Sequence, residues 1–312
     1  MELHPLNMPA VSIIMNIFNG AATLREALQS ALEQTFTDWE LLVWDDCSTD
    51  DSAAIVASFR DPRIRYLLAP QAMSLGEARD AAIRLAEGEW LAFLDQDDIW
   101  LPRKLELQLA LADSPSVGMI YGRTLAFHRD GRQCDHDYFH EFCELPEGNI
   151  FVELLGRGCF VAMSSVLLRR SAVMEAGAIP GFVRTTPDYF LYLAVSSRYT
   201  ARALQQVVCR YRVYGSSMSS LYRRETLEET LLLVDEWRSH VSETDYRRRR
   251  SHLVTAIAIE ELRTGGTRWA GAKRLWKDGS LIWLSGRPWV HLWRAVHRQL
   301  VRPFWMRHGQ TT

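Results

Sequence analysis

WLAFLDQDDIWLP, residues 90–102, is the stretch from which the fold is predicted. Its apolar run stops at three carboxylates, Asp95, Asp97 and Asp98, and then turns apolar again. An apolar run of this length is typical of a buried strand, and a strand that ends in acids presents them at its carboxyl end, where open α/β sheets bind ligands. Carboxylates so close repel one another, so we expect a positive partner. Two interpretations remain open here: a divalent cation holding a diphosphate, or a solvated acidic turn in which Asp98 caps the next helix.

Apolar runs that predict buried strands alternate with segments of helical spacing through the first 110 residues. The runs are Val11–Ile17, Trp39–Trp44, Arg63–Leu68 and the strand that opens residues 90–102. Capping patterns that predict helix starts lie between them, at Thr23 with Glu26, Ser48 with Asp51, and Ser74 with Glu77. The alternation predicts an α/β fold with a mainly parallel sheet covered by helices.

A second predicted strand also ends in acids, at Asp45-Asp46. Because right-handed crossovers bring the ends of parallel strands to one side of a sheet, two acidic strand ends predict one shared site. Such a site suits a phosphorylated ligand with a metal. The chain contains no G-x-G-x-x-G and no G-x-x-x-x-G-K-[ST] motif, which argues against dinucleotide-binding and P-loop proteins.

The pattern changes in the second half of the chain. Val117–Phe127 and Ala203–Tyr211 predict further strands, and Asp188 precedes a helical pattern, where an isolated aspartate would be interpreted as a cap. From about Leu221 the spacing is helical only. We therefore predict two domains, a catalytic domain over 1–220 and a helical extension over 221–312.

Composition narrows the class of protein. The net charge of −2 predicts no general attraction to nucleic acid, and five scattered cysteines without a C-x-x-C fit reduced thiols in the cytoplasm. We see neither a secretory signal nor the roughly 20 apolar residues that span a bilayer. After Gly265, however, six tryptophans alternate with basic residues, and Asp278 is the only acid. This composition suits peripheral contact with an anionic membrane, on the inner face of the cell membrane. The alternative is a helical bundle that packs its tryptophans onto the catalytic domain.

Several segments together resemble family 2 glycosyltransferases. They are VSIIMNIFNG (11–20), QTFTDWE (34–40), DDCSTD (45–50), GEARDAA (76–82) with AEGE (86–89), and LDQDDIWLP (94–102). They cover the first 110 residues in the family's order, the likeness continues more loosely to about residue 220, and the helical tail lies outside it. The resemblance implies the A-type glycosyltransferase fold and transfer, with inversion, from a nucleotide-diphosphate sugar.

The resemblance also implies roles for individual residues. Asp188 would be the catalytic base, and Asp97 with Asp95 would hold Mn²⁺ or Mg²⁺ against the diphosphate. The implied nucleotide-binding residues are Ile17, Phe18, Asp46, Arg79 and Asp95. Three positions depart from the family pattern: Pro187 stands where an acid often precedes the base, Asn16 where proline is common, and Tyr214 where a histidine often follows the Tyr-Arg segment.

The sequence thus predicts an inverting glycosyltransferase that moves a sugar, most commonly from a UDP-sugar, to a hydroxyl of a glycan or lipid-linked acceptor in bacterial surface polysaccharide synthesis. Two alternatives stay open at this point. One is a nucleotidyltransferase, which the lack of a glycine-rich loop bearing Lys or Arg near the first strand disfavours. The other is a catalytically silent protein that binds a nucleotide or sugar.

Overall fold

The computed structural model describes residues 8–128, 133–137, 143–213 and 221–263. Contacts between Cα atoms divide the chain into two compact units, Met1–Leu221 and Tyr222–Thr312, which we treat separately. The tryptophan- and arginine-rich tail and Tyr214, both named by the sequence interpretation, lie outside the described residues.

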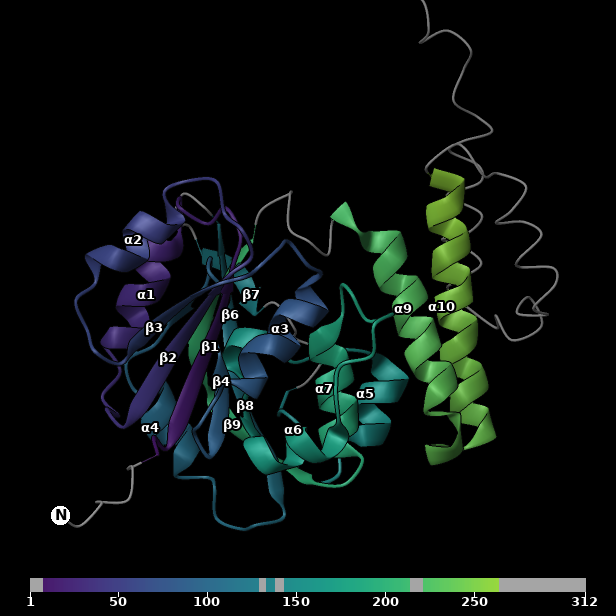
Figure 1. Cartoon of the computed structure of the whole chain (residues 1–312). Helices are drawn as coiled ribbons and strands as arrows, with labels where there is room; N and C mark the ends of the chain where they lie inside the picture. The colour runs from purple at the N-terminus through teal and green to yellow at the C-terminus, as the bar shows by residue number, and fades with distance from the viewer. Residues whose placement is uncertain (1–7, 129–132, 138–142, 214–220, 264–312) are drawn as a thin grey trace, which may run out of the picture. The chain divides into compact units, whose positions relative to one another are not determined.

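Among the described residues, a mixed sheet of nine strands organises the first unit (Figure 1). In space the strands run in the order β3-β2-β1-β4-β8-β6-β9-β5, and β7 pairs with β6. Strands β1 to β4 are parallel to one another, as predicted, whereas β8 runs antiparallel to both β4 and β6, and β5 antiparallel to β9. The bounds are β1 Val11–Ile17, β2 Trp39–Asp45, β3 Ile64–Leu68, β4 Trp90–Phe93, β5 Ile99–Trp100, β6 Val117–His128, β7 Gln133–Asp137, β8 Leu167–Arg169 and β9 Thr200–Val213.

Helices cover both faces of this sheet. Figure 1 shows α1 and α2 on one side of strands β1 to β4 and α3 on the other. The bounds in the first unit are α1 Leu24–Leu32, α2 Ser52–Ser58, α3 Leu75–Arg84, α4 Lys104–Leu109, α5 Phe151–Arg157, η1 (3-10) Met163–Ser165, α6 Arg170–Ala176 and α7 Pro187–Ser196. The second unit contains α9 Arg223–Glu236, η2 (3-10) Arg238–His240 and α10 Glu243–Arg263, and α9 packs along α10.

Strand β1 lies between β2 and β4 in the parallel half, and its side chains are buried on both faces of the sheet. Ile13, Met15 and Ile17 are almost fully buried in a core cluster that includes Leu24 and Leu28 of α1. The register pairs Ile17 with Asp45 of β2 and Ile14 with Phe93 of β4. The carboxyl ends of β1, β2 and β4 therefore meet at one edge of the sheet, so the prediction that both acidic strand ends share an edge is confirmed.

Only one of the three predicted capping patterns forms. At α3 the Ser74 hydroxyl accepts a hydrogen bond from the Glu77 amide, and the Glu77 carboxylate accepts one from the Ser74 amide. At α1 the prediction is wrong, because Thr23 makes no side-chain cap and Glu26 is instead 2.7 Å from Arg212. At α2 it is also wrong: the helix begins at Ser52, and the Ser48 hydroxyl accepts a bond from the Asn19 amide. Long-range partners compete successfully for both side chains.

Across the described ranges, no helix is both long and apolar enough to cross a bilayer.

Candidate active site

Asp98 is the buried anchor of the acidic turn that follows β4. It is 1% exposed, its Oδ2 accepts the Ser164 hydroxyl proton at 2.6 Å, and its Oδ1 accepts the Arg212 amide proton at 3.0 Å. Burial, followed by the negative charges of Asp97 and Asp95, raises the pKa of Asp98 well above its usual range. The interpretation of Asp98 as a helix cap is wrong: α4 begins at Lys104 with Arg103 before it. Asp98 instead ties the turn to η1 and β9, because both distant segments supply donors.

Arg79 is the positive partner that the clustered carboxylates require. Its side chain lies in α3, is 5% exposed, and donates from Nη2 to Asp95 Oδ1 at 3.2 Å. The Asp95 amide donates in turn to the Ser164 hydroxyl at 3.1 Å. Asp95 keeps 37% of its side chain exposed. One oxygen of Asp95 is therefore held by the protein while the carboxylate still faces solvent.

The end of β1 is joined to the acidic turn through Gln96. The Gln96 side chain accepts from the Phe18 amide at 2.9 Å and donates to the Phe18 carbonyl at 3.1 Å. The Phe18 side chain is 54% exposed, whereas Ile17 is buried and its carbonyl accepts from the Asp46 amide at 2.9 Å. Of the two residues predicted to contact a nucleotide here, Ile17 is thus buried and Phe18 is exposed.

The two acids at the end of β2 have different environments. Asp45 is buried and accepts bonds from the Tyr66 hydroxyl at 2.6 Å and the Ser48 amide at 2.8 Å. Asp46 is half-buried and accepts from the Met73 amide at 2.9 Å. Burial raises the pKa of Asp46, and the Met73 amide opposes that shift. Asp45 is therefore a structural residue, and Asp46 is the more exposed of the pair.

Asp188 reaches the same region from the second half of the chain. It occupies the first turn of α7, after Pro187, and its Oδ1 accepts from the Tyr189 amide at 2.8 Å. The Cys159 thiol lies 3.9 Å from Oδ2. Burial raises the pKa of Asp188, the positive charge of Arg79 lowers it, and the negative charge of Asp95 raises it. These mutual effects place Arg79, Asp95 and Asp188 within electrostatic reach of one another.

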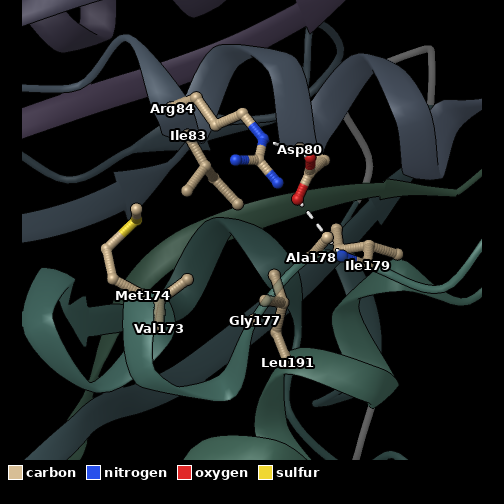
Figure 2. A pocket seen from close by; sticks show the side chains of 9 residues that line it. All are labelled: Asp80, Ile83, Arg84, Val173, Met174, Gly177, Ala178, Ile179 and Leu191. Carbon is tan, nitrogen blue, oxygen red and sulfur yellow. Dashed lines mark hydrogen bonds and ion pairs between the residues drawn. The ribbon is translucent and has the colours of Figure 1, made fainter.

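Helix α3 holds the loop before Asp188 in register with Arg79. Asp80 accepts from the Ile179 amide at 3.1 Å and pairs with Arg84 at 2.7 Å, beside a small pocket between α3, α6 and α7 (Figure 2). At Gly76 the helix backbone approaches so closely that an added Cβ would lie 2.1 Å from the Val183 carbonyl oxygen. The same helix therefore fixes Arg79 on one side and the approach to α7 on another.

The donor set fits a divalent cation that is shared with a substrate. Nowhere in the described residues do three or more His, Cys, Asp or Glu side chains form a group able to hold an ion. Asp95 and Asp97 are both partly exposed and offer the hard oxygen ligands that Mg²⁺ and Mn²⁺ prefer. Magnesium is commonly bound by one or two carboxylates together with substrate phosphates rather than by a full protein cage. Asp98 is not available, because both its oxygens accept hydrogen bonds within the fold.

A family model described as "Glycosyl transferase family 2" matches residues 12–177, just over half of the chain. The chain belongs to glycosyl transferase family 2. It is an enzyme of the glycosyltransferase class, and the family match sets aside both the nucleotidyltransferase and the catalytically silent binder.

Relatives and solved structures extend this assignment. The chain is 32% identical over 227 residues to the Escherichia coli UDP-Glc:alpha-D-GlcNAc-diphosphoundecaprenol beta-1,3-glucosyltransferase WfgD, which covers 72% of this chain and 85% of the relative. It is 27% identical to the Bacillus subtilis putative teichuronic acid biosynthesis glycosyltransferase TuaG, over 68% of this chain and 82% of TuaG.

Two solved structures share the fold. Staphylococcus aureus TarS in complex with UDP-GlcNAc superimposes with a TM-score of 0.60 at 19% identity, over 79% of this chain and 72% of TarS. The Pyrobaculum calidifontis mannosyltransferase PcManGT, in complex with GDP-Man and Mn²⁺, gives 0.61 at 18% identity, over 95% and 88%. The predicted A-type glycosyltransferase fold is confirmed.

Two residues that organise the site were not predicted from the sequence as part of it. Ser164 supports both Asp95 and Asp98, yet in the sequence it is only a hydroxyl within the apolar run 163–168. Gln96 stands inside the acidic motif and looks like a spacer. The one available signal was a pair of serines interrupting an otherwise apolar segment, which is out of place unless a buried partner exists.

Proposed function

We propose that this glycosyltransferase moves a hexose from a UDP-sugar to a hydroxyl of a lipid-linked diphosphate glycan, with inversion, during synthesis of a bacterial surface polysaccharide. The names of the relatives support the substrate classes: WfgD is a UDP-Glc-dependent enzyme that acts on a diphosphoundecaprenol acceptor, TuaG is named for teichuronic acid biosynthesis, and Rhizobium meliloti ExoO, 34% identical over 140 residues, for succinoglycan biosynthesis.

On the donor side, the edge formed by β1, β2 and β4 would receive the nucleotide. Asp46 would contact the base, and the exposed Phe18 ring offers it an apolar face. Arg79 and Asp95 would lie near the ribose and diphosphate. Asp97, with Asp95 as helper, would hold Mn²⁺ or Mg²⁺. The cation would neutralise the negative charge that grows on the departing nucleotide diphosphate.

The catalytic step needs one carboxylate that removes the acceptor's hydroxyl proton from the face opposite the leaving group. We assign this role to Asp188. The observation that carries the assignment is the buried Arg79 guanidinium, which hydrogen-bonds Asp95 and also lowers the pKa of Asp188. Arg79 thereby favours the ionised form of a half-buried carboxylate whose pKa is raised by burial. The Tyr189 amide holds one Asp188 oxygen, which leaves the carboxylate oriented from the start of α7.

Asp188→Asn tests the base. The variant should bind UDP and Mn²⁺ like the wild type but lose transfer by about 10²- to 10⁴-fold, the usual range for a general base. Glu175→Gln is the control, because Glu175 is a surface carboxylate that bonds the Tyr199 hydroxyl. Intact turnover in Asp188→Asn would show that the base lies elsewhere. Donor identity is tested by thermal shift with UDP-, dTDP- and GDP-sugars, with and without Mn²⁺; a larger metal-dependent shift with a GDP-sugar refutes the UDP assignment.

We further propose that the tail after Gly265 contacts the anionic inner face of the cell membrane, where a lipid-linked acceptor is found. Its alternating tryptophans and basic residues support this placement. When vesicles containing anionic lipid are sedimented, the full chain should be found in the pellet, and a chain that ends near Gly265 should stay in the supernatant. Binding to the vesicles should weaken as salt is added, because salt screens the attraction between the basic residues and the anionic lipid. Equal sedimentation of the two forms contradicts the proposal.

A further inference from the structure

Arg212, near the end of β9, makes two hydrogen bonds to the acidic turn and one to α1. Its backbone amide donates to Asp98 Oδ1 at 3.0 Å, and its Nε donates to the carbonyl oxygen of Asp97 at 2.8 Å. Its Nη2 donates to Glu26 Oε2 of α1 at 2.7 Å. The side chain is 6% exposed, and its guanidinium lies 4.5 Å from the centre of the Phe127 ring. The guanidinium is therefore held from three directions.

The bond to the Asp97 carbonyl differs in kind from the bond to Asp98. The Asp98 carboxylate accepts hydrogen bonds, and these fix the position of the turn but not the orientation of the preceding residue, Asp97. A hydrogen bond to the Asp97 carbonyl fixes the plane of the peptide that follows Asp97. Because a peptide unit is planar and only two dihedrals per residue are soft, that bond limits the directions in which the Asp97 carboxylate can point. Residues that orient a metal ligand in this way commonly change metal affinity when they are replaced.

We propose that Arg212 is a positioning residue that sets the Asp97 carboxylate for the divalent cation, with Glu26 holding the guanidinium in place. The proposal rests on the metal role of Asp97 in the proposed function. It accounts for the missing capping box at α1: the Glu26 carboxylate pairs with Arg212 and does not cap its own helix. It also explains why a buried arginine directs its Nε at a backbone carbonyl rather than at a carboxylate.

Arg210 provides a matched control within the same strand. Its guanidinium lies 4.4 Å from the centre of the same Phe127 ring, and it pairs with Ile99 of β5. Unlike Arg212, it has no hydrogen bond to the acidic turn among the contacts of the described residues. A comparison of Arg212→Lys with Arg210→Lys therefore separates the bond to the Asp97 carbonyl from the general effect of shortening an arginine on β9.

The experiment measures Mn²⁺ affinity at saturating UDP by the paramagnetic resonance signal of free Mn²⁺, and UDP affinity without metal by calorimetry. Arg212→Lys should weaken Mn²⁺ binding about 10-fold or more while leaving metal-free UDP binding unchanged. Glu26→Gln should weaken Mn²⁺ binding less, because the Glu26 side chain is 59% exposed. The double variant should be no weaker than Arg212→Lys alone. Arg210→Lys should match the wild type.

The outcomes separate this inference from the proposed function. If the wild type binds no Mn²⁺ with UDP, the metal role of Asp97 fails, and this inference fails with it. If the wild type binds Mn²⁺ and Arg212→Lys binds it equally well, only the positioning role is overturned. If Arg212→Lys does not fold, as judged by thermal unfolding, Glu26→Gln decides: unchanged Mn²⁺ affinity in that variant overturns the proposal. Equal loss of metal-free UDP binding would assign Arg212 to the fold rather than to the metal.

Discussion

The buried Lys104 at the start of α4 allows a quantitative prediction of how the free energy of unfolding depends on pH. Its side chain is 1% exposed, and its Nζ has no hydrogen-bond partner among the described residues. The amine lies 4.2 Å from the centre of the Trp100 ring, and the Cys209 thiol is close enough to act weakly on its charge. Burial lowers the pKa of Lys104 from 10.5 to about 7. An uncompensated buried cation is costly, so the folded protein favours the neutral amine.

The size of the effect follows from linkage. At pH 7 the unfolded chain keeps Lys104 protonated while the folded chain protonates it only about half of the time, which costs folding about 4 kcal/mol. At pH 9 the cost falls to about 2 kcal/mol, because the unfolded lysine is then closer to its own pKa. Between these values the unfolded state binds more protons than the folded state, so this group makes stability rise with pH. Lys104→Met keeps the length of the side chain and removes the titration.

We expect Lys104→Met to be more stable than the wild type at pH 7, and we expect its advantage to shrink by about 2 kcal/mol at pH 9. Urea unfolding of both proteins at the two pH values measures this. Arg103→Met is the control: the neighbouring side chain is 62% exposed, so its difference from the wild type should not change with pH. An advantage of Lys104→Met that stays constant from pH 7 to pH 9, or a variant that is less stable at pH 7, refutes the reasoning. Cys209 is present in all three proteins and cancels in the comparison.

Two further predictions concern the placement and ionisation of Asp188, the proposed base. Gly76→Ala should cost about 1–3 kcal/mol in a urea titration and also lower kcat, because its Cβ would lie 2.1 Å from the Val183 carbonyl oxygen and push the loop before α7. Gly156→Ala, whose Cβ meets nothing within 4 Å, should leave both unchanged or raise stability slightly, and equal behaviour of the two variants would be a contradiction. Transfer activity should fall as pH falls through the raised pKa of Asp188. Arg79→Gln should shift this acidic limb of the pH–rate profile to higher pH, since Arg79 lowers this pKa. A limb that stays in place in a pH–rate profile of the residual activity would show that Asp188 is not the group being titrated.

The parallel half of the fold could be predicted because each element there carries its own local signal. Apolar runs, helical spacing and turn residues lie within a few positions of one another, and the register then brings Asp46 and Asp95 to one edge. The second half follows less from local pattern. Strand β8 has only three residues, Leu167–Arg169, and pairs antiparallel with both β4 and β6. Its place depends on partners about 50 to 80 positions away, which periodicity does not reveal.

The same difference between local and long-range information explains why one of two similar capping patterns forms and the other does not. Ser74 with Glu77 forms a capping box because the long-range contacts of the structure leave Glu77 at its own helix start. Thr23 with Glu26 has an equivalent pattern, but Arg212 lies within reach of Glu26 and takes its carboxylate. Sequence spacing describes what a side chain can do locally. It does not describe which distant charge arrives beside it, so the role of Glu26 could be found only from the folded chain.

The hydrogen bonds of Arg212 join positions far apart in the chain: 114 residues separate it from Asp98 and 186 from Glu26. Contacts of such separation close slowly and late in folding, because the entropy of the intervening loop must be lost first. During synthesis from the amino terminus, the residues of β1, β2 and β4 are made before those of β9. The hydrogen bonds from Arg212 to the acidic turn require β9, which pairs with β5 next to that turn. If Asp97 holds the cation as proposed, we expect a chain that ends before β9 to bind the cation less tightly, because it lacks these bonds.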